Sequence, residues 1–175
     1  SSGKRITRAA DDAAGLAISG RMESQIRGLS MSIRNTKDGQ SLVDTQEGAL
    51  QEVSSILQRM RELAVQASSG IAASADKNFL NTEMAQLYQE IDAIGANTKF
   101  NDKNILTGAA FTFYTDIDVK GVAVTATALS ISGAALGVGL SSTLVSIGST
   151  SNNAAIKITI SLVDGAIASV AGMRS

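Results

Sequence analysis

Apolar residues recur every three or four positions along three stretches of the first hundred residues, and no proline interrupts them. This spacing places the apolar side chains on one face of an α-helix, as in the seam of a coiled coil. A proline-free chain also keeps the backbone N–H at every interior helix position. We therefore predict long helices with one apolar stripe each. The stripes are Met22, Ile26, Leu29 and Ile33; Leu50, Val53, Leu57, Met60, Ala64 and Ala67; and Leu80, Met84, Leu87, Ile91 and Ile94.

The ends of these helices have local signals. Residues 68–70 read Ser-Ser-Gly, which is typical of a helix end, and either Ser74 or Asp76 is expected to cap the next helix. That second helix is predicted to end within residues 95–100. A single helix over residues 8–67 would be roughly 90 Å long at about 1.5 Å per residue. Such a helix needs partner helices from its own chain or from neighbouring chains to cover its stripe.

Several glycines lie inside the predicted helices, where each costs about 1 kcal/mol relative to alanine. One interpretation is local fraying or a kink. The other is that a residue without a side chain lets a neighbouring helix or subunit approach closely. The positions are Gly15, Gly20, Gly28, Gly39 and Gly48.

The second half of the chain has a different pattern. Aromatic and β-branched residues alternate in part over residues 111–124, with a turn expected at 118–121, so we predict a β-hairpin. Residues 125–155 are rich in Ala, Gly, Ser and Thr and are interpreted as short strands and loops. Helical spacing returns from Ala155, with Ile156, Ile160, Val163, Ile167 and Val170 on one stripe. We expect this C-terminal helix to pack against the N-terminal ones.

Together these patterns predict a mainly α fold with a β-hairpin region (α+β), built as an elongated antiparallel helical rod or coiled-coil bundle with short strands. We expect three parts. Residues 1–106 form the N-terminal helical part of the rod, and residues 107–154 form the hairpin and a short variable region. Residues 155–175 form a helix that packs back on the rod.

Composition excludes several classes of chemistry. The chain has neither Cys nor His, which removes disulfides, thiolate zinc sites, Ser–His catalysis and the HExxH zinc motif. The 15 basic and 16 acidic residues nearly balance, whereas nucleic-acid binders usually have a basic excess. We therefore predict no enzymatic activity, no cofactor or metal and no nucleic-acid partner. An uncharged segment, residues 121–148, has too many Gly, Ser and Thr for a membrane span, so no membrane insertion is expected.

The charged residues near the N-terminus do not indicate a site. Asp11 and Asp12 are neighbours, and adjacent residues on a helix point about 100° apart, so they do not form a carboxylate pair. Negative charge is favourable near the start of a helix. Lys4, Arg5 and Arg8 are interpreted as a solvated or intersubunit face.

Short sequences in a fixed order resemble the bacterial flagellin family. The N-terminal matches are SSGKRI at 1–6, DDAAGLAI at 11–18, SQIRGL at 24–29, DG at 38–39, EGAL at 47–50, LQRMRELAVQ at 57–66, EID at 90–92 and FNDK at 100–103. A thinner match to the family's C-terminal region involves Asp164, Ala166, Ile167, Val170, Arg174 and Ser175. The resemblance covers residues 1–106 densely and about 160–175 more thinly.

The resemblance implies a structural subunit of the flagellar filament that self-assembles for motility. It implies export through the flagellar type III apparatus to an extracellular filament. The expected partners are other flagellin subunits, an export chaperone, and cap and junction proteins. The chain resembles the inner rod domain without its terminal polymerisation segments, with no large outer domain.

The resemblance also points to contact residues. Arg59, Leu63 and Glu90 match positions through which Toll-like innate receptors recognise flagellins. Arg59 and Leu63 lie one turn apart, so we expect them to form one surface patch. On an assembly protein this patch is expected first to contact neighbouring subunits, with receptor recognition as the second role.

Two other functions stay open. One is a cell-surface flagellin that acts as a binding module for a host receptor or an extracellular glycan. The other is the hook–filament junction protein, a relative whose pattern usually has a proline after the paired aspartates. Ala13 occupies that position here, which favours the filament subunit.

Overall fold

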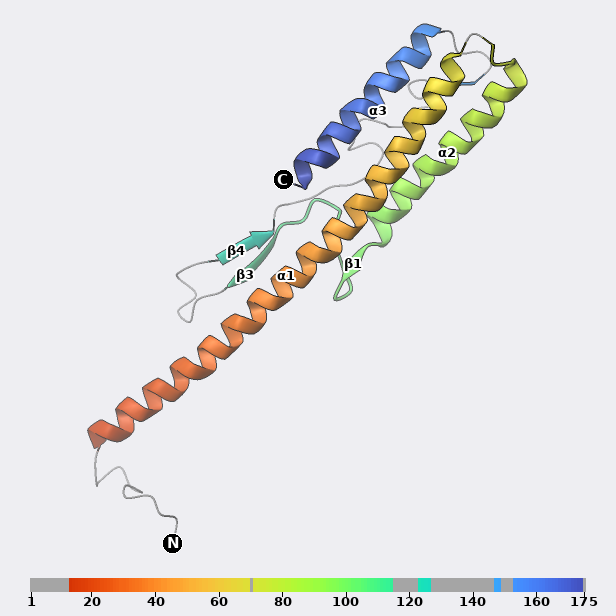
Figure 1. The fold of residues 1–175 in the computed structure, drawn as a ribbon. Helices are drawn as coiled ribbons and strands as arrows, with labels where there is room; N and C mark the ends of the chain where they lie inside the picture. Colours follow the sequence, from red (N-terminus) through yellow and green to blue (C-terminus); the bar gives the residue numbers. More distant parts are fainter. Residues whose placement is uncertain (1–12, 70, 115–122, 127–146, 149–152, 175) are drawn as a thin grey trace. The chain divides into compact units, whose positions relative to one another are not determined.

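The computed structural model describes residues 13–69, 71–114, 123–126, 147–148 and 153–174. They form three helices, α1 (Ala13–Ser68), α2 (Ser74–Asn97) and α3 (Asn153–Met173) (Figure 1). The four strands are short: β1 (Lys99–Phe100), β2 (Lys103–Asn104), β3 (Phe111–Tyr114) and β4 (Ala123–Ala126). They pair as two separate two-stranded sheets, β1 with β2 and β3 with β4. The predicted class, mainly helical with short strands, is confirmed.

The chain divides into two compact units. The first unit holds Ser1–Ser41 and Thr112–Ala126, and the second holds Leu42–Phe111 and Thr127–Ser175. Helix α1 contributes residues to both. The predicted three-part division at residues 106 and 154 groups the chain differently and stays a prediction.

The second unit has its core where three helices meet. The predicted stripe from Leu50 to Ala67 is buried along α1. Met84 and Ile91 of α2 and Val163 of α3 are buried with it, together with other residues from each helix. The apolar spacing thus identified the inward faces of all three helices in this unit.

Ion pairs show the direction of α3 relative to α1 in the second unit. Arg61 donates to Asp164 over 2.6 Å, and Arg174 donates to Glu47 over 2.6 Å. From Glu47 to Arg61 along α1, the paired residue on α3 changes from Arg174 back to Asp164. The two helices are therefore antiparallel (Figure 1). The predicted packing of the C-terminal helix against the N-terminal ones is therefore confirmed, with α3 starting at Asn153 rather than Ala155.

A small hairpin that the sequence analysis missed follows α2. Strands β1 and β2 are antiparallel, with Lys99 opposite Asn104 and Phe100 opposite Lys103. The two linking residues, Asn101 and Asp102, have positive φ angles of 49° and 62°. This left-handed conformation is typical of two-residue hairpin turns, and Asn and Asp tolerate it better than most residues.

Two polar side chains, the buried Gln46 and the half-buried Asn104, attach this hairpin to the helices. The Gln46 side chain, on α1, donates from Nε2 to the backbone oxygen of Ile105 over 3.0 Å. Asn104 donates to the backbone oxygen of Gly95 over 3.1 Å, near the end of α2. Each bond pairs a backbone carbonyl group with a side-chain donor.

The first unit packs differently. The Asn35 side chain donates to the backbone oxygen of Tyr114 over 2.9 Å. A Cβ atom at Gly39 would lie 3.2 Å from Cδ2 of Phe113, so β3 approaches α1 at a residue without a side chain. The element that approaches α1 at Gly39 is thus a strand of the same chain, not the neighbouring helix or subunit of the close-approach interpretation, and a Cβ at Gly20 or Gly48 would meet nothing within 4 Å. The small and polar side of α1 faces the strand here.

Two boundary predictions are confirmed and one is wrong. Helix α1 ends at Ser68, and α2 ends at Asn97, as expected. The capping position of α2 is Ala73, which makes no side-chain hydrogen bond, rather than Ser74 or Asp76. Asp76 instead lies in the first turn, where its charge is favourable to the helix dipole.

Some predictions fall on parts of the chain outside the described residues. These are the charges at residues 4–12, the hairpin turn at 118–121, and most of the strands and loops expected over 125–155. The pairing of β3 with β4 confirms the predicted hairpin itself.

Candidate contact surface

Arg59 is the centre of an ion cluster that joins α1 to α2. Its Nε atom donates to Glu83 over 2.8 Å, and its Nη1 atom donates to Glu62 over 3.2 Å. The Nη2 atom lies 2.7 Å from the same Glu83 oxygen. The hydrogen bond to Glu83, and next the one to Glu62, raises the pKa of Arg59 above its ordinary value. Arg59 is therefore a charged, oriented group on the exposed surface of the second unit.

Leu63 does not share that surface. Its exposed fraction is 0%, because it points into the core between the helices. The prediction that Arg59 and Leu63 form one surface patch is therefore wrong. Residues one turn apart on a helix can still differ by up to about 60° in the direction of their side chains. Here that difference places Arg59 on the exposed side of α1 and Leu63 on its buried side.

Glu90 is exposed on α2, but the acidic residue that contacts Arg59 is Glu83. The two glutamates are seven residues apart, so they lie two turns apart on the same side of α2. The sequence analysis missed Glu83 and Glu62. The contact of Arg59 with Glu62 could have been predicted, because Glu62 is three residues after Arg59 on the same helix. The contact with Glu83 could not, because it depends on how α1 packs against α2.

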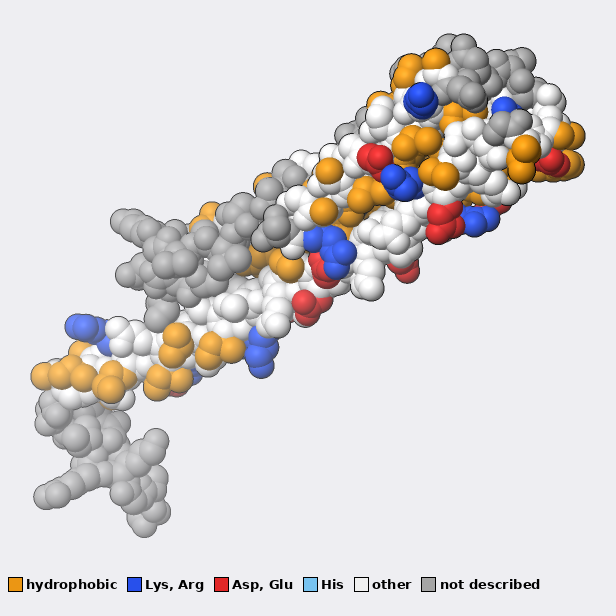
Figure 2. All heavy atoms as spheres, turned by 45° about the horizontal axis from the view of Figure 1, so that its top comes forward, with side chains coloured by type: hydrophobic (Ala, Val, Ile, Leu, Met, Phe, Trp, Pro, Cys, Tyr) orange, Lys and Arg blue, Asp and Glu red, His pale blue; other side chains and the backbone are white. Residues whose placement is uncertain are grey.

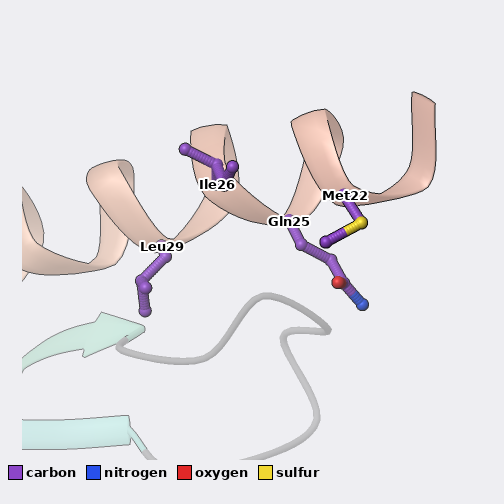
Figure 3. Close-up of a pocket in the computed structure, with 4 residues that line it drawn as sticks. All are labelled: Met22, Gln25, Ile26 and Leu29. Atoms are coloured by element: carbon purple, nitrogen blue, oxygen red, sulfur yellow. The ribbon is translucent and has the colours of Figure 1, made fainter. Parts of the chain in front are cut away.

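A second surface feature lies in the first unit. Four predicted stripe residues of α1 are exposed, with Ile26 at 64%. Figure 2 shows hydrophobic side chains in a row along this part of α1. Met22, Gln25, Ile26 and Leu29 line a shallow hollow on successive turns (Figure 3). We call Met22, Ile26, Leu29 and Ile33 the apolar stripe.

A neighbouring side of α1 packs on β3 and leaves the apolar stripe exposed. Asn35 and Gly39 face the strand, and Gly39 is buried there. A helix that buries its small polar side and exposes its large apolar side is unusual for a monomer, since contiguous exposed apolar patches mark interaction sites. The surface is thus suited to cover by another helix.

The described residues offer no metal site, because no group of three or more Asp or Glu side chains gathers among them. Residues 154–173 of α3 are long and apolar enough to cross a membrane by length and composition alone. A packed core helix passes the same test, and Ile156, Val163 and Val170 are buried in the second unit. The expected absence of membrane insertion stays a prediction.

Comparisons with known proteins identify relatives of this chain. The family model for the bacterial flagellin N-terminal helical region matches residues 1–110. A flagellin of Halalkalibacterium halodurans is 58% identical over 106 residues, covering 61% of this chain and 39% of that protein. The flagellar filament core protein flaB2 of Brachyspira hyodysenteriae is 51% identical over 108 residues, covering 62% of this chain and 38% of that protein.

The fold comparison agrees with the sequence comparison. The crystal structure of Bacillus cereus flagellin matches with a TM-score of 0.68 and 32% identity, covering 81% of this chain and 78% of that one. The chain spans 39% of the length of the first of the two sequence relatives and 38% of the second. The matched family region covers well over half of the chain, from the first predicted stripe to β2 and beyond. This chain belongs to the bacterial flagellin family.

Proposed function

We propose that this chain is part of a structural subunit that associates with copies of itself to build a bacterial flagellar filament. The observation that carries the proposal is the apolar stripe of α1, which the described residues leave exposed. Side chains at this spacing are covered by packing against another helix. In a filament subunit, such helices come from the rest of the subunit or from its neighbours.

The proposed role is mechanical rather than catalytic. The chain has no His or Cys, and three of the ion pairs among the described residues join α1 to α2 or to α3. Rigid helices with complementary surfaces are what an assembled fibre needs. Family membership supports this role, because the relatives described above are flagellins and a flagellar filament core protein.

The other partners are part of the same proposal. A filament subunit requires export, so we include secretion to the cell exterior, an export chaperone, and cap and junction proteins. Arg59 and Glu90 are retained as exposed candidates for contact with a neighbouring subunit or with a Toll-like innate receptor. Leu63 is retained only as the residue that supports this surface from within the core.

The test is deletion of the gene in the bacterium that encodes this chain, followed by electron microscopy of cells and a swimming assay. Cells should lose their filaments and motility, and a plasmid copy should restore both. A Leu63→Lys copy should fail to restore them, because it places a charge in the core. Loss of filaments with other flagellins released into the medium would indicate the junction role instead. Normal filaments after deletion would contradict both.

A further inference from the structure

Helices α1 and α3 each carry buried apolar residues at intervals of seven. On α3 these are Ile156, Val163 and Val170, and on α1 they are Leu50, Leu57 and Ala64. If one helix slid along the other by seven residues, about 10 Å at about 1.5 Å per residue, buried apolar positions would meet again. The apolar spacing therefore does not by itself select the register, which is the set of α3 residues that lie level with given residues of α1.

A buried polar contact often selects the register of packed helices, but none between α1 and α3 is found among the described residues. The buried polar residues of the second unit are Gln46 and Thr159. Thr159 donates to the backbone oxygen of Ala155 over 3.2 Å, within α3, so this bond would move with the helix. Gln46 bonds to Ile105, outside α3. What can distinguish the registers is therefore the fit of the side chains and the charges at the edge of the contact.

Two ion pairs join α1 to α3 at that edge. Asp164 accepts from Arg61, and Glu47 accepts from Arg174, each over 2.6 Å. Glu47 and Arg61 are two heptads apart, so they lie on one side of α1. The pairs have opposite polarity, because α1 supplies the anion of one and the cation of the other. We call them the register pairs.

A slip of one heptad loses both register pairs. A slip toward the N-terminal end of α1 would bring Lys157, in place of Asp164, level with Arg61, and two cations would then face each other. A slip the other way would bring the uncharged Ala171 level with Arg61. An exposed ion pair contributes little to stability, but the difference between attraction and repulsion discriminates between arrangements that bury similar surfaces.

We propose that the register pairs select the alignment of α3 on α1 and that Lys157 acts against the slipped alternative. Arg61 determines the specificity, since it attracts Asp164 in the native register and would repel Lys157 in the slipped one. This inference goes beyond the filament function, because it concerns the folded subunit before any assembly. A slipped α3 would displace its exposed residues by about 10 Å along α1, and copies that pack regularly need one alignment.

The test reverses the α1 member of each register pair in the full-length gene product. The reversed variant, Arg61→Glu with Glu47→Arg, keeps the net charge and turns both attractions into repulsions. In the slipped register, its new carboxylate at position 61 would face Lys157. The restored variant adds Asp164→Arg and Arg174→Glu, so that both attractions return with their polarity exchanged.

The readout is the distance between two nitroxide labels, measured by pulsed electron paramagnetic resonance on labelled protein diluted with unlabelled protein. The chain has no Cys, so Val43→Cys and Ser161→Cys supply the two labelling sites, and both positions are exposed. With Asp164 level with Arg61, the labels are about 32 Å apart along the helix axis. The slip toward the N-terminal end of α1 reduces this separation to about 21 Å.

The wild type and the restored variant should show the longer distance alone. The reversed variant should gain a second distance that is shorter by about 10 Å, and adding Lys157→Glu to it should remove that distance again. Arg59→Glu is the matched control, because it makes the same substitution two residues away and breaks ion pairs that do not involve α3. It should show the longer distance alone.

Other results would overturn the inference. If the reversed variant is folded by circular dichroism and keeps only the longer distance, the register is set elsewhere, for example where the backbone N–H of Ile147 donates to Asn81 over 3.2 Å. A shorter distance that also appears in Arg59→Glu would show general loosening instead of selection by charge. If the reversed variant does not fold, the restored variant decides: the wild-type distance supports the register pairs, and failure to recover it refutes them.

Discussion

Replacing Gly39 with alanine tests how closely β3 packs on α1. Alanine in a helix interior is more stable than glycine by about 1 kcal/mol. At Gly39, however, the added Cβ would lie 3.2 Å from Cδ2 and 3.4 Å from Cγ of Phe113. Carbon atoms pack best at about 3.5–4.0 Å, so the ring must move, and overpacking of this kind costs about 1–3 kcal/mol. The net effect of Gly39→Ala is therefore expected to lie between about zero and 2 kcal/mol of destabilisation.

Gly20→Ala is the matched control in the same helix and the same unit. A Cβ at Gly20 would meet nothing within 4 Å, so the full gain of about 1 kcal/mol is expected. The two variants should differ by at least about 1 kcal/mol, which is about 2–4 °C in Tm for a chain of this size. Thermal unfolding followed by far-UV circular dichroism measures the difference.

The double variant Gly39→Ala, Phe113→Leu identifies the cause. A smaller side chain at position 113 leaves room for the new methyl group, so Gly39→Ala should be less harmful in that background than in the wild type. If Gly39→Ala raises the Tm as much as Gly20→Ala, the close approach of Phe113 to α1 is refuted. The same conclusion follows if the Phe113→Leu background makes no difference.

Three further substitutions test the second unit. Leu63→Ala should lower the free energy of unfolding by about 2–5 kcal/mol in urea titration, whereas the exposed Val65→Ala should change it little; equal effects would contradict the burial of Leu63. Gln46→Leu should cost about 1–3 kcal/mol, because the backbone oxygen of Ile105 loses its donor, and a neutral result would show that water replaces it. Asp102→Gly should stabilise the β1–β2 hairpin by about 1 kcal/mol, because glycine adopts positive φ without strain, and unchanged hydrogen exchange there would argue against the turn conformation.

The helices were predictable because their signals are local. The end of α1 at Ser68 follows from a Ser-Ser-Gly sequence, and the inward faces of the second unit follow from steps of three and four. The β3–β4 hairpin was also visible from alternating residues around a turn. In each case the residues that determine the structure are neighbours in sequence.

The parts that escaped prediction depend on contacts between distant residues. Periodicity showed that Met22 to Ile33 form an apolar side, but not that the side with Asn35 and Gly39 packs on β3. Likewise, the contact of Arg59 with Glu83 needs the register of α1 against α2, which no local pattern contains. The β1–β2 hairpin was missed because each strand has two residues, too few to show alternation.

The candidate contact surface shows the same division. Of the three residues that the family resemblance selected, Arg59 and Glu90 are exposed and Leu63 is fully buried, and the contact role of the two exposed residues stays a prediction. A resemblance to a family indicates which positions correspond, but it does not indicate whether the side chains at those positions are exposed in this chain. Exposure is set by which side of α1 the core covers, and that depends on α2 and α3.

The central claim is that this chain is part of a self-assembling filament subunit. The most direct measurement is electron microscopy of the purified full-length gene product, at neutral pH, after addition of short filament seeds. The account predicts long helical filaments that grow from the seed ends. A folded protein that stays monomeric at every concentration, with seeds unextended, would contradict it.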